Sequence, residues 1–302
     1  MIYSVVVTYN GKKWLDKCIQ SLANSNVSNN IIIVDNGSSD GTPEIVRKSY
    51  PNVEVIEPGH NLGFGKANNI GLKKAYEAGA DFVFLINQDA WVEKDTIEKL
   101  VKAAKCNKGY GILSPVHLTG EGYALDYGFF NCILAGRAKS FLSDLYLKPK
   151  EEIAEIYQLD FINGAFWLLP RKTIEMVGGF NPFFFQYGED NDYVNRCRYF
   201  ELKIGFVPHA NAYHDRVQHD SDKKRDLMLH IPFLIRLFDP GDSFAINTCI
   251  RILAKATFTN LLTIKLAQAQ NTAAELMYFI SNKNKILELT DQIRSPGLTF
   301  LD

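Results

Sequence analysis

The chain has 302 residues, of which 46% are hydrophobic and 22% charged, as expected for a soluble globular protein with one large α/β domain. Its net charge of -1 argues against nucleic acid as a partner, because proteins that bind phosphate backbones usually present a basic face. The five cysteines are odd in number and form no CxxC pair, which argues against a zinc site and a disulfide framework and indicates a reducing, cytoplasmic compartment.

The first hundred residues alternate strand and helix patterns with short connections. Apolar runs without alternation are typical of strands buried on both faces. They occur at 2–8, 31–36 and 81–87, with a shorter run at 53–57, and helical patterns lie between them at 12–23, 38–50 and 63–80. This order predicts a parallel sheet with right-handed crossovers, whose ligands bind at the carboxyl ends of the strands.

Polar residues follow these strands, namely Thr8, Asn10, Asp35, Asn87 and Asp89. The carboxylate of Asp35 can accept hydrogen bonds from the base or ribose of a nucleotide, although Asp35 also suits a turn before the next helix. Side chains two apart on an extended segment share one face, so Asn87 can hold a ribose hydroxyl while Asp89 binds magnesium or manganese. The alternative for Asp89 is a cap for the following helix.

A glycine-rich segment at 61–71 contains Gly63 and Gly65, with Asn68 where a third glycine would complete a dinucleotide fingerprint. That fingerprint belongs at the first strand-to-helix turn, and this segment follows the third strand. We therefore set aside a nicotinamide dehydrogenase. Lys66 or the nearby backbone amides can still contact a diphosphate.

The pattern changes after residue 110. We expect short mixed strands and turns at 110–120 and 122–136, a buried strand within 158–170, helices at 171–180 and 189–202, and one or two edge strands at 203–215. The segment 138–157 has no clear assignment, and the remainder is mostly helical. With neither repeat nor linker, the sequence predicts one domain over residues 1–220 and a helical extension over 221–302 packed on it.

The segment FFFQYGEDNDY at 183–193 places carboxylates beside aromatic bulk. A desolvated carboxylate has a perturbed proton affinity, which is one signature of a catalytic acid or base. The alternative is a loop of core aromatics followed by a helix start, where acidic residues favour the positive end of the helix dipole. His214, after a predicted strand, could complete a metal site with Asp89 or be a partly buried polar residue.

Residues 245–267 form the most apolar stretch, but Arg251, Lys255 and Lys265 interrupt it before it reaches the roughly 20 apolar residues that a membrane span requires. Their spacing suits one polar stripe on an amphipathic helix. Packing on the domain is the favoured interpretation, and resting on a membrane surface is the other.

Six motifs, taken in order, resemble those of glycosyltransferase family 2, in its bacterial rhamnosyltransferase-like branch: VVVTYN, IIIVDNGSSDGT, NLGFGKANNIG, LINQDA, the long segment INGAFWLLPRKTIEMVGGFNPFFFQYGEDND, and AYHD. The resemblance covers roughly residues 1–217. It implies a GT-A fold with a mostly parallel central sheet flanked by helices, a nucleotide-sugar donor, a divalent cation (Mg or Mn) and inversion at the anomeric carbon. It also implies a saccharide or lipid-linked acceptor in cell-surface polysaccharide synthesis, with a possible peripheral contact at the inner face of the membrane.

By the same resemblance, the nucleotide-binding strand ends are those of Thr8, Asn10 and Asp35. Asp89 matches the metal-binding aspartate and His214 a late metal ligand, while Asn87 stands where many members have another aspartate. The tyrosine and arginine-asparagine run that often follows in this branch is not found, which leaves the acceptor open.

Asp190 matches the family's catalytic base, and Glu189 is expected to orient it or to bind an acceptor hydroxyl. Phe185, Tyr187 and Trp167 are candidates for an apolar acceptor platform that also excludes water, although a buried core position is the favoured interpretation of Trp167. The rival function is a non-catalytic nucleotide-sugar-binding protein of the same fold. Such a protein has no use for a base, so the presence of Asp190 favours the enzyme.

Overall fold

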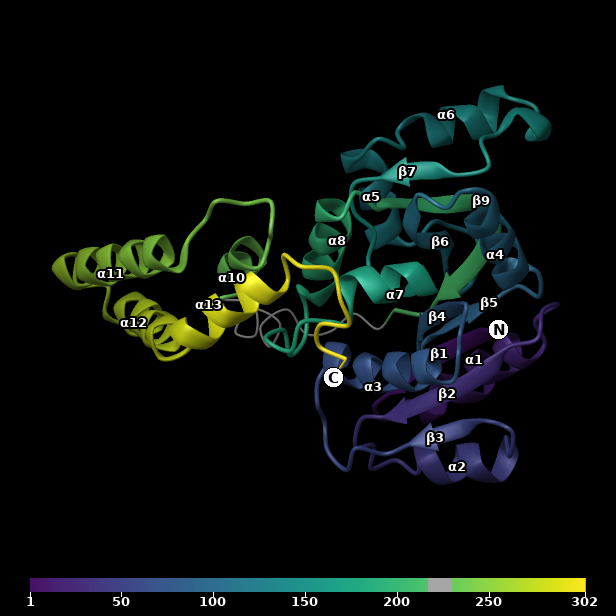
Figure 1. The fold of residues 1–302 in the computed structure, drawn as a ribbon, viewed down its shortest axis with the longest axis horizontal. Coiled ribbons are helices and arrows are strands. Elements are labelled where there is room, and N and C mark those ends of the chain that lie inside the picture. The colour runs from purple at the N-terminus through teal and green to yellow at the C-terminus, as the bar shows by residue number, and fades with distance from the viewer. Residues whose placement is uncertain (217–229, 302) are drawn as a thin grey trace. The chain divides into compact units, whose positions relative to one another are not determined.

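The computed structural model describes residues 1–216 and 230–301, and within them the centre of the fold is a mixed sheet of nine strands (Figure 1). Eight strands follow the order β3-β2-β1-β4-β8-β6-β9-β5, and β7 pairs with β9 beside this path. The strands are β1 Ile2–Thr8, β2 Asn30–Asp35, β3 Glu54–Ile56, β4 Phe82–Asn87, β5 Ala90–Val92, β6 Tyr110–Thr119, β7 Tyr157–Leu159, β8 Phe166–Pro170 and β9 Lys203–His214.

The amino-terminal half of the sheet is parallel, as predicted. Strand β1 pairs with β2 and β4 in parallel register, and β2 pairs with β3 in the same sense. All but the first residue of β2 are buried, which is the burial expected of an apolar strand covered on both faces. The register places Thr8 opposite Asp35, and Val7 opposite Asn87, so the polar strand ends lie on neighbouring strands.

The other half of the sheet is mixed. Strand β8 is antiparallel to β4 and β6, whereas β9 is parallel to β6 and antiparallel to β5 and β7. The prediction of edge strands at 203–215 is wrong, because β9 is one long strand with hydrogen-bonded neighbours on both sides. The twelve residues of β9 include a register shift against β6 between Val207 and Asn211.

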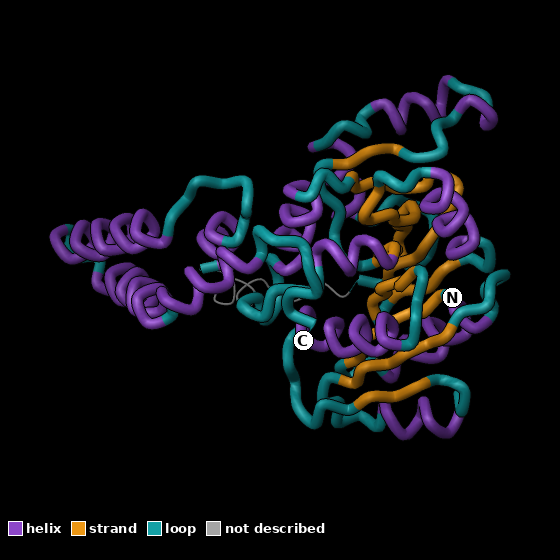
Figure 2. The backbone as a smooth tube through the Cα atoms, viewed as in Figure 1, coloured by secondary structure: helices purple, strands orange, loops and turns teal. Residues whose placement is uncertain are grey.

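Helices cover both faces of the sheet (Figure 2). One buried core contains apolar residues of α3, α5, α7 and α8, and the other contains residues of α1, α2 and α4. The bounds are α1 Lys12–Ala23, α2 Thr42–Ser49, α3 Phe64–Glu77, α4 Thr96–Cys106, α5 Tyr127–Ala135, α6 Ser140–Leu147, α7 Arg171–Val177 and α8 Glu189–Tyr199, with a 3-10 turn at Lys150–Glu152.

Helix α5 corrects the prediction of strands and turns at 122–136. Asp126 precedes the helix and its carboxylate accepts a hydrogen bond from the backbone N–H of Phe129 at 3.0 Å, which is an N-cap. Phe129 and Ile133 then lie four apart and are fully buried on one face. Helical spacing of the apolar residues and the N-cap therefore explain why this segment is a helix and not the expected strands and turns.

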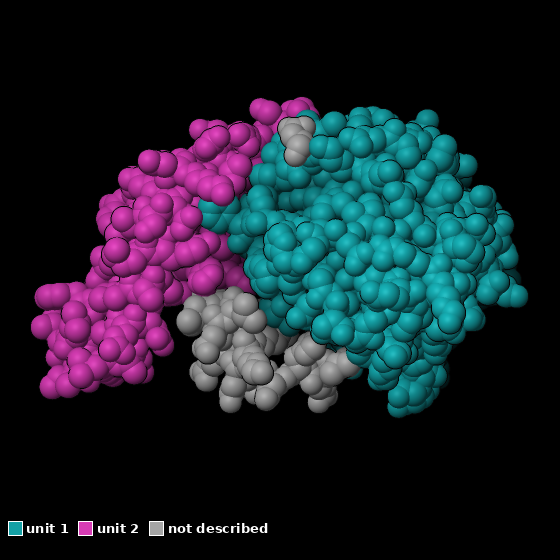
Figure 3. Space-filling view, turned by 90° about the horizontal axis from the view of Figure 1, so that it is seen from below, with its two compact units in different colours: residues 1–218, 297–302 teal, residues 219–296 magenta. Residues whose placement is uncertain are grey.

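The chain divides into two compact units, residues 1–218 with 297–302, and residues 219–296 (Figure 3). The predicted boundary at residue 220 lies outside the described residues. The last residues return to the first unit, where the carbonyl of Thr299 accepts a hydrogen bond from the N–H of Gly179 at 2.8 Å and Leu301 is buried. No pattern in the sequence predicted this return.

The second unit is helical in its described part, with α10 Ile231–Leu237, α11 Ile246–Leu262, α12 Leu266–Ser281 and α13 Lys283–Gln292. The segment 245–267, predicted as a single helix, contains the end of one helix and the start of the next. Across residues 1–216 and 230–301, every helix is too short or too polar to cross a bilayer.

Candidate active site

The ends of β1 and β2 are joined by side-chain hydrogen bonds. Thr8 Oγ1 donates to Asp35 Oδ1 at 2.9 Å, and both side chains are buried. The N–H and hydroxyl of Ser38 also donate to the Asp35 carboxylate, at 2.8 and 2.6 Å. Since two carboxylate oxygens offer about four lone-pair sites, Asp35 retains capacity for one further donor.

Asn10 connects the loop after β1 to the loop after β2. Its side-chain oxygen accepts from the N–H of Ser39 at 2.9 Å, and its own N–H donates to Ser38 Oγ at 2.8 Å. Its φ of 50° lies in the left-handed region, which asparagine tolerates better than most residues. Asn10 is exposed, so it also presents polar backbone and side-chain groups at the edge where the strands end.

The three residues at the end of β4 have different surroundings. The Oδ1 atom of Asn87 is buried and has no hydrogen-bond partner among the described residues. The amide of Gln88 clamps the backbone of Tyr9, accepting from its N–H at 2.8 Å and donating to its carbonyl at 3.2 Å. Asp89 lies in the turn before β5 and is partly exposed; it does not cap α4, whose N-cap residue is Asp95.

Asp89 and His214 lie together at this edge. The Oδ1 of Asp89 is 3.3 Å from Nε2 of His214, and the backbone N–H of Asp215 donates to the carbonyl of Asp89 at 2.9 Å. Antiparallel pairing of β5 with β9 produces this proximity, because Ala90 is the register partner of His214. A carboxylate oxygen and an imidazole nitrogen at this separation could contact one divalent cation.

Asp126 and Arg216 complete this cluster, and neither was identified from the sequence. The Oδ2 of Asp126 lies 3.8 Å from Nδ1 of His214 and accepts a hydrogen bond from Nε of Arg216 at 2.6 Å. At 3.8 Å the carboxylate lies beyond hydrogen-bond range, and the buried Nδ1 of His214 has no hydrogen-bond partner among the described residues, so Asp126 contributes a nearby negative charge to the histidine. The helix-capping pattern, an aspartate before an apolar run, was the one signal for Asp126.

Glu189 and Asp190 begin α8 with different surroundings. Burial, and then the charge of Asp190, raise the pKa of Glu189 well above its ordinary value. Burial also raises the pKa of Asp190, against which the backbone N–H groups of Asn191 and Gly164 stabilise its charged form. The Oε2 of Glu189 is buried without a hydrogen-bond partner among the described residues. We infer that Glu189 holds the proton of the pair and Asp190 the charge.

The third carboxylate of the segment, Asp192, is structural. It forms a fully buried ion pair with Arg196, with separations of 2.9 Å to Nε and 2.8 Å to Nη2. The guanidinium also donates to the carbonyls of Val177 and Gly179 at the end of α7. Asp192 therefore anchors α8 to α7 and is not a candidate base.

The glycine-rich segment serves close packing. Gly63 has a φ of 84°, and a Cβ at this position would lie 2.2 Å from the carbonyl oxygen of Phe185. The N–H of Phe64 donates to that same oxygen at 3.0 Å, so the loop before α3 holds the loop before α8. Lys66 is exposed in the first turn of α3.

The three aromatic residues predicted for the acceptor lie in different environments. Phe185 is 49% exposed and Tyr187 is partly exposed, with a φ of 68° that is unusual for a bulky residue. Trp167 is fully buried and stacks on Phe180 at a centroid distance of 5.8 Å. We therefore assign Trp167 to the core, and keep Phe185 and Tyr187 as candidate acceptor contacts.

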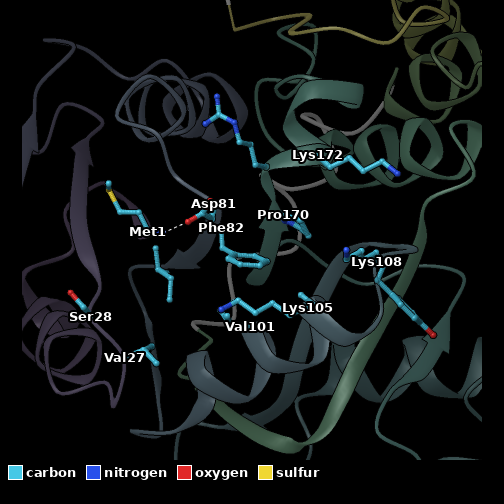
Figure 4. Close-up of a pocket in the computed structure, with 14 residues that line it drawn as sticks. Met1, Val27, Ser28, Asp81, Phe82, Val101, Lys105, Lys108, Pro170 and Lys172 are labelled. Carbon is cyan, nitrogen blue, oxygen red and sulfur yellow. Dashed lines mark hydrogen bonds and ion pairs between the residues drawn. The ribbon is translucent and has the colours of Figure 1, made fainter.

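A hollow of about 810 Å³ lies at the opposite edge of the sheet (Figure 4). It is lined by residues at the amino ends of strands, including Ile2 of β1, Phe82 of β4 and Tyr110 of β6. Asp81 in its wall is ion-paired with the amino group of Met1. Ligands of open α/β sheets bind at the carboxyl ends of the strands, so we locate the site by its side chains and not by this hollow.

Comparison with known proteins gives consistent matches. The family model described as "Glycosyl transferase family 2" matches residues 4–125. A dTDP-rhamnosyl transferase, RfbF of Shigella flexneri, is 34% identical over 215 residues, covering 70% of this chain and 68% of that protein. An N-acetylglucosaminyl-diphospho-decaprenol L-rhamnosyltransferase of Mycobacterium tuberculosis is 28% identical over 231 residues, covering 70% and 75%. The mannosyltransferase PcManGT of Pyrobaculum calidifontis, solved with GDP-Man and Mn2+, has a TM-score of 0.55 at 18% identity, covering 95% of this chain and 86% of that chain.

Proposed function

The chain belongs to glycosyltransferase family 2, in its rhamnosyltransferase-like branch, and on that premise we propose a metal-dependent, inverting transfer reaction. The donor is a nucleotide-diphosphate sugar, and the acceptor is a hydroxyl of a saccharide or lipid-linked intermediate in cell-surface polysaccharide synthesis. The observation that carries this proposal is the Asp89–His214 pair at the carboxyl ends of the strands, at a separation of 3.3 Å.

The nucleotide is assigned to the ends of β1, β2 and β4. Asp35 has one free acceptor position for the base or ribose, and its orientation is fixed by Thr8 and Ser38. The buried Oδ1 of Asn87 is an acceptor suited to a ribose hydroxyl. Asn10 and Lys66 are placed beside the nucleotide as further polar contacts. Together these groups would bind the nucleotide through hydrogen bonds to its polar atoms.

The cation is assigned to Asp89 and His214. In the described ranges no group of three His, Cys, Asp or Glu side chains gathers as a metal site, and these two residues would hold the cation together with oxygens of the diphosphate and of water. The carboxylate and diphosphate oxygens suit manganese or magnesium, and the imidazole nitrogen favours manganese of the two. When bound, the cation offsets the charge that develops on the leaving diphosphate.

Asp190 is the proposed general base. As the acceptor oxygen bonds to the anomeric carbon, the bond from that carbon to the diphosphate breaks, and the acceptor hydroxyl passes its proton to Asp190. One displacement of this kind inverts the anomeric configuration. Glu189, protonated, would donate a hydrogen bond to an acceptor oxygen or to Asp190. Phe185 and Tyr187 offer aromatic faces on which a sugar ring can stack.

We also propose that the protein works in the cytoplasm, at the inner face of the membrane. All five cysteines are free, which suits a reducing compartment. The Mycobacterium tuberculosis relative is named for a diphospho-decaprenol acceptor, and an acceptor of that kind would be held in a membrane.

The proposal is tested by release of nucleoside diphosphate from a panel of nucleotide sugars. The panel begins with dTDP-rhamnose, after the name of the Shigella flexneri relative. We expect release with manganese and none in excess chelator. Asp89→Asn should abolish release, whereas Asp81→Asn, at the opposite edge of the sheet, should not change it. Tight donor binding without any release or transfer would instead identify a nucleotide-sugar-binding protein, and equal activity in chelator would refute the metal.

A further inference from the structure

The second unit contains a helical hairpin formed by α11 and α12. These two helices lie side by side (Figure 1), joined by residues 263–265. The hydroxyl of Thr257 in α11 donates to that of Thr272 in α12 at 3.0 Å, and Leu253 and Ala269 are buried. The two helices therefore pack against each other through buried side chains, and the turn lies at the far end of the hairpin.

The turn and the adjoining residues expose a run of large apolar side chains, which we call the hairpin tip. All eight residues from 261 to 268 are exposed. The large apolar members are 52–80% exposed: Phe258, Leu261, Leu262, Ile264 and Leu266. Single exposed apolar residues are ordinary on protein surfaces, but a contiguous group of this size marks an interaction site.

Ile264 occupies a position that normally takes glycine. The N–H of Lys265 donates to the carbonyl of Asn260 at 2.8 Å, and the N–H of Ile264 to that of Leu261 at 3.1 Å. These two bonds form a Schellman motif at the end of α11, with Ile264 at the residue that must be left-handed, at a φ of 55°. A β-branched residue is strained there, and strain that persists at an exposed position points to a use for its side chain.

The charged residues near the tip in the sequence are all cationic. Arg251, Lys255 and Lys265 are exposed, and the sequence has no Asp or Glu between Ser243 and Ala274. Apolar side chains at the end of a hairpin with only cations behind them match the surface of an anionic bilayer, where a hydrocarbon layer lies beneath negative headgroups.

We propose that the hairpin tip inserts its apolar side chains into the surface of an anionic lipid bilayer, with Lys265 and Lys255 at the headgroups. This inference deepens the proposed function, because a lipid-linked acceptor would reside in that bilayer. The proposed contact is peripheral, with the side chains of the tip at the bilayer surface. The insertion is assigned to the turn between two helices, and not to one face of a long amphipathic helix.

Co-flotation of the full chain with vesicles tests the proposal. We expect binding to vesicles of phosphatidylglycerol and phosphatidylethanolamine, weaker binding in high salt, and little binding to phosphatidylcholine alone. Leu262→Ser should weaken binding about tenfold, as should Ile264→Gly, because each removes a side chain that the bilayer would bury. Leu147→Ser, a change at a comparably exposed leucine of α6, should leave binding unchanged.

Ile264→Gly separates the contact from the fold, because glycine relieves the left-handed strain at the turn. Its melting temperature should hold or rise while vesicle binding falls. Unchanged binding in both tip variants would overturn the proposal. So would a self-associated wild-type chain that the tip variants make monomeric, which would identify a second copy as the occupant. Nucleoside diphosphate release from soluble donor should be unaffected by the tip variants, so this test and that of the reaction can fail separately.

Discussion

At the residue scale, the asymmetry between Glu189 and Asp190 predicts a pH dependence of stability. Burial raises the pKa of Glu189 above its value in the unfolded chain, so the folded protein holds a proton that the unfolded chain releases. The free energy of unfolding should therefore fall as pH rises from the ordinary glutamate range through the raised pKa. Glu189→Gln should remove that fall and be more stable than wild type in alkali by roughly 1–3 kcal/mol.

Urea unfolding of both proteins at a series of pH values measures this difference. Glu121→Gln, an exchange at an exposed glutamate, serves as the control and should follow wild type. A wild-type profile parallel to that of Glu189→Gln would show that Glu189 is not the protonated member of the pair.

The assignment of Asp35 to the nucleotide predicts that its replacement weakens nucleotide binding. Replacing a charged hydrogen-bond acceptor with alanine should cost about 1.5–3 kcal/mol of binding free energy, measured by calorimetry with the nucleoside diphosphate of the active donor. Asp40→Ala is the matched change, because Asp40 accepts from the N–H of Thr42 at 3.0 Å at the start of α2. That variant should lose stability and keep its affinity. Equal affinities for Asp35→Ala and wild type would remove Asp35 from the nucleotide site.

The polar strand ends could be found from sequence because a buried parallel strand has an unmistakable apolar run and its ligands lie where that run stops. Asp126 and Arg216 could not be found in this way. Asp126 lies in a segment that was expected to form short strands and turns, and Arg216 acquires its role through a contact with Asp126, 90 residues away in sequence. Such roles depend on tertiary pairing, which local periodicity does not contain.

At the element scale, alanine substitutions at two glycines of the loop before α3 should destabilise the protein to different extents. Gly59 and Gly63 have nearly equal φ values of 86° and 84°, but Gly63 also has a ψ of 169°, a combination that is essentially restricted to glycine, whereas a Cβ at Gly59 meets nothing within 4 Å. Gly59→Ala should therefore cost only the left-handed strain, about 1–2 kcal/mol. Gly63→Ala should cost more and also slow transfer, because its Cβ displaces Phe185 and the loop that leads to Glu189. Equal losses in denaturant unfolding would contradict both the larger backbone strain at Gly63 and the contact with Phe185.

The elements of the amino-terminal half were predictable because each strand and helix there has a single pattern of apolar residues along its whole length. The later elements were harder, since β9 combines alternating and continuous burial within one strand. The hairpin was missed for a related reason: residues 245–267 keep an apolar character through a turn that has neither glycine nor proline. The left-handed residue after α11 is Ile264, where glycine or asparagine would normally indicate the end of a helix.

At the scale of the whole molecule, the family match and the likeness to a solved glycosyltransferase confirm the predicted GT-A fold. The return of residues 297–302 to the first unit gives that unit a late contribution to its core. Leu301 is 5% exposed there, so Leu301→Ala should cost about 2–5 kcal/mol of unfolding free energy. Leu266→Ala, at the exposed hairpin tip, should change stability by less than about 0.5 kcal/mol. Similar values for the two variants would show that the carboxyl-terminal residues are not part of the core.

The most direct test of the proposed chemistry is the transfer rate of Asp190→Asn as a function of pH, with donor affinity measured alongside. Asparagine keeps the shape of the side chain but cannot take a proton. The rate should fall by a factor of about 10²–10⁴ while donor binding is unchanged. The wild-type rate should rise as pH passes through the raised pKa of Asp190, because the base must be deprotonated, and this rise should be absent from the variant. Near-normal transfer by Asp190→Asn, with the wild-type pH profile, would contradict the assignment and place the base elsewhere.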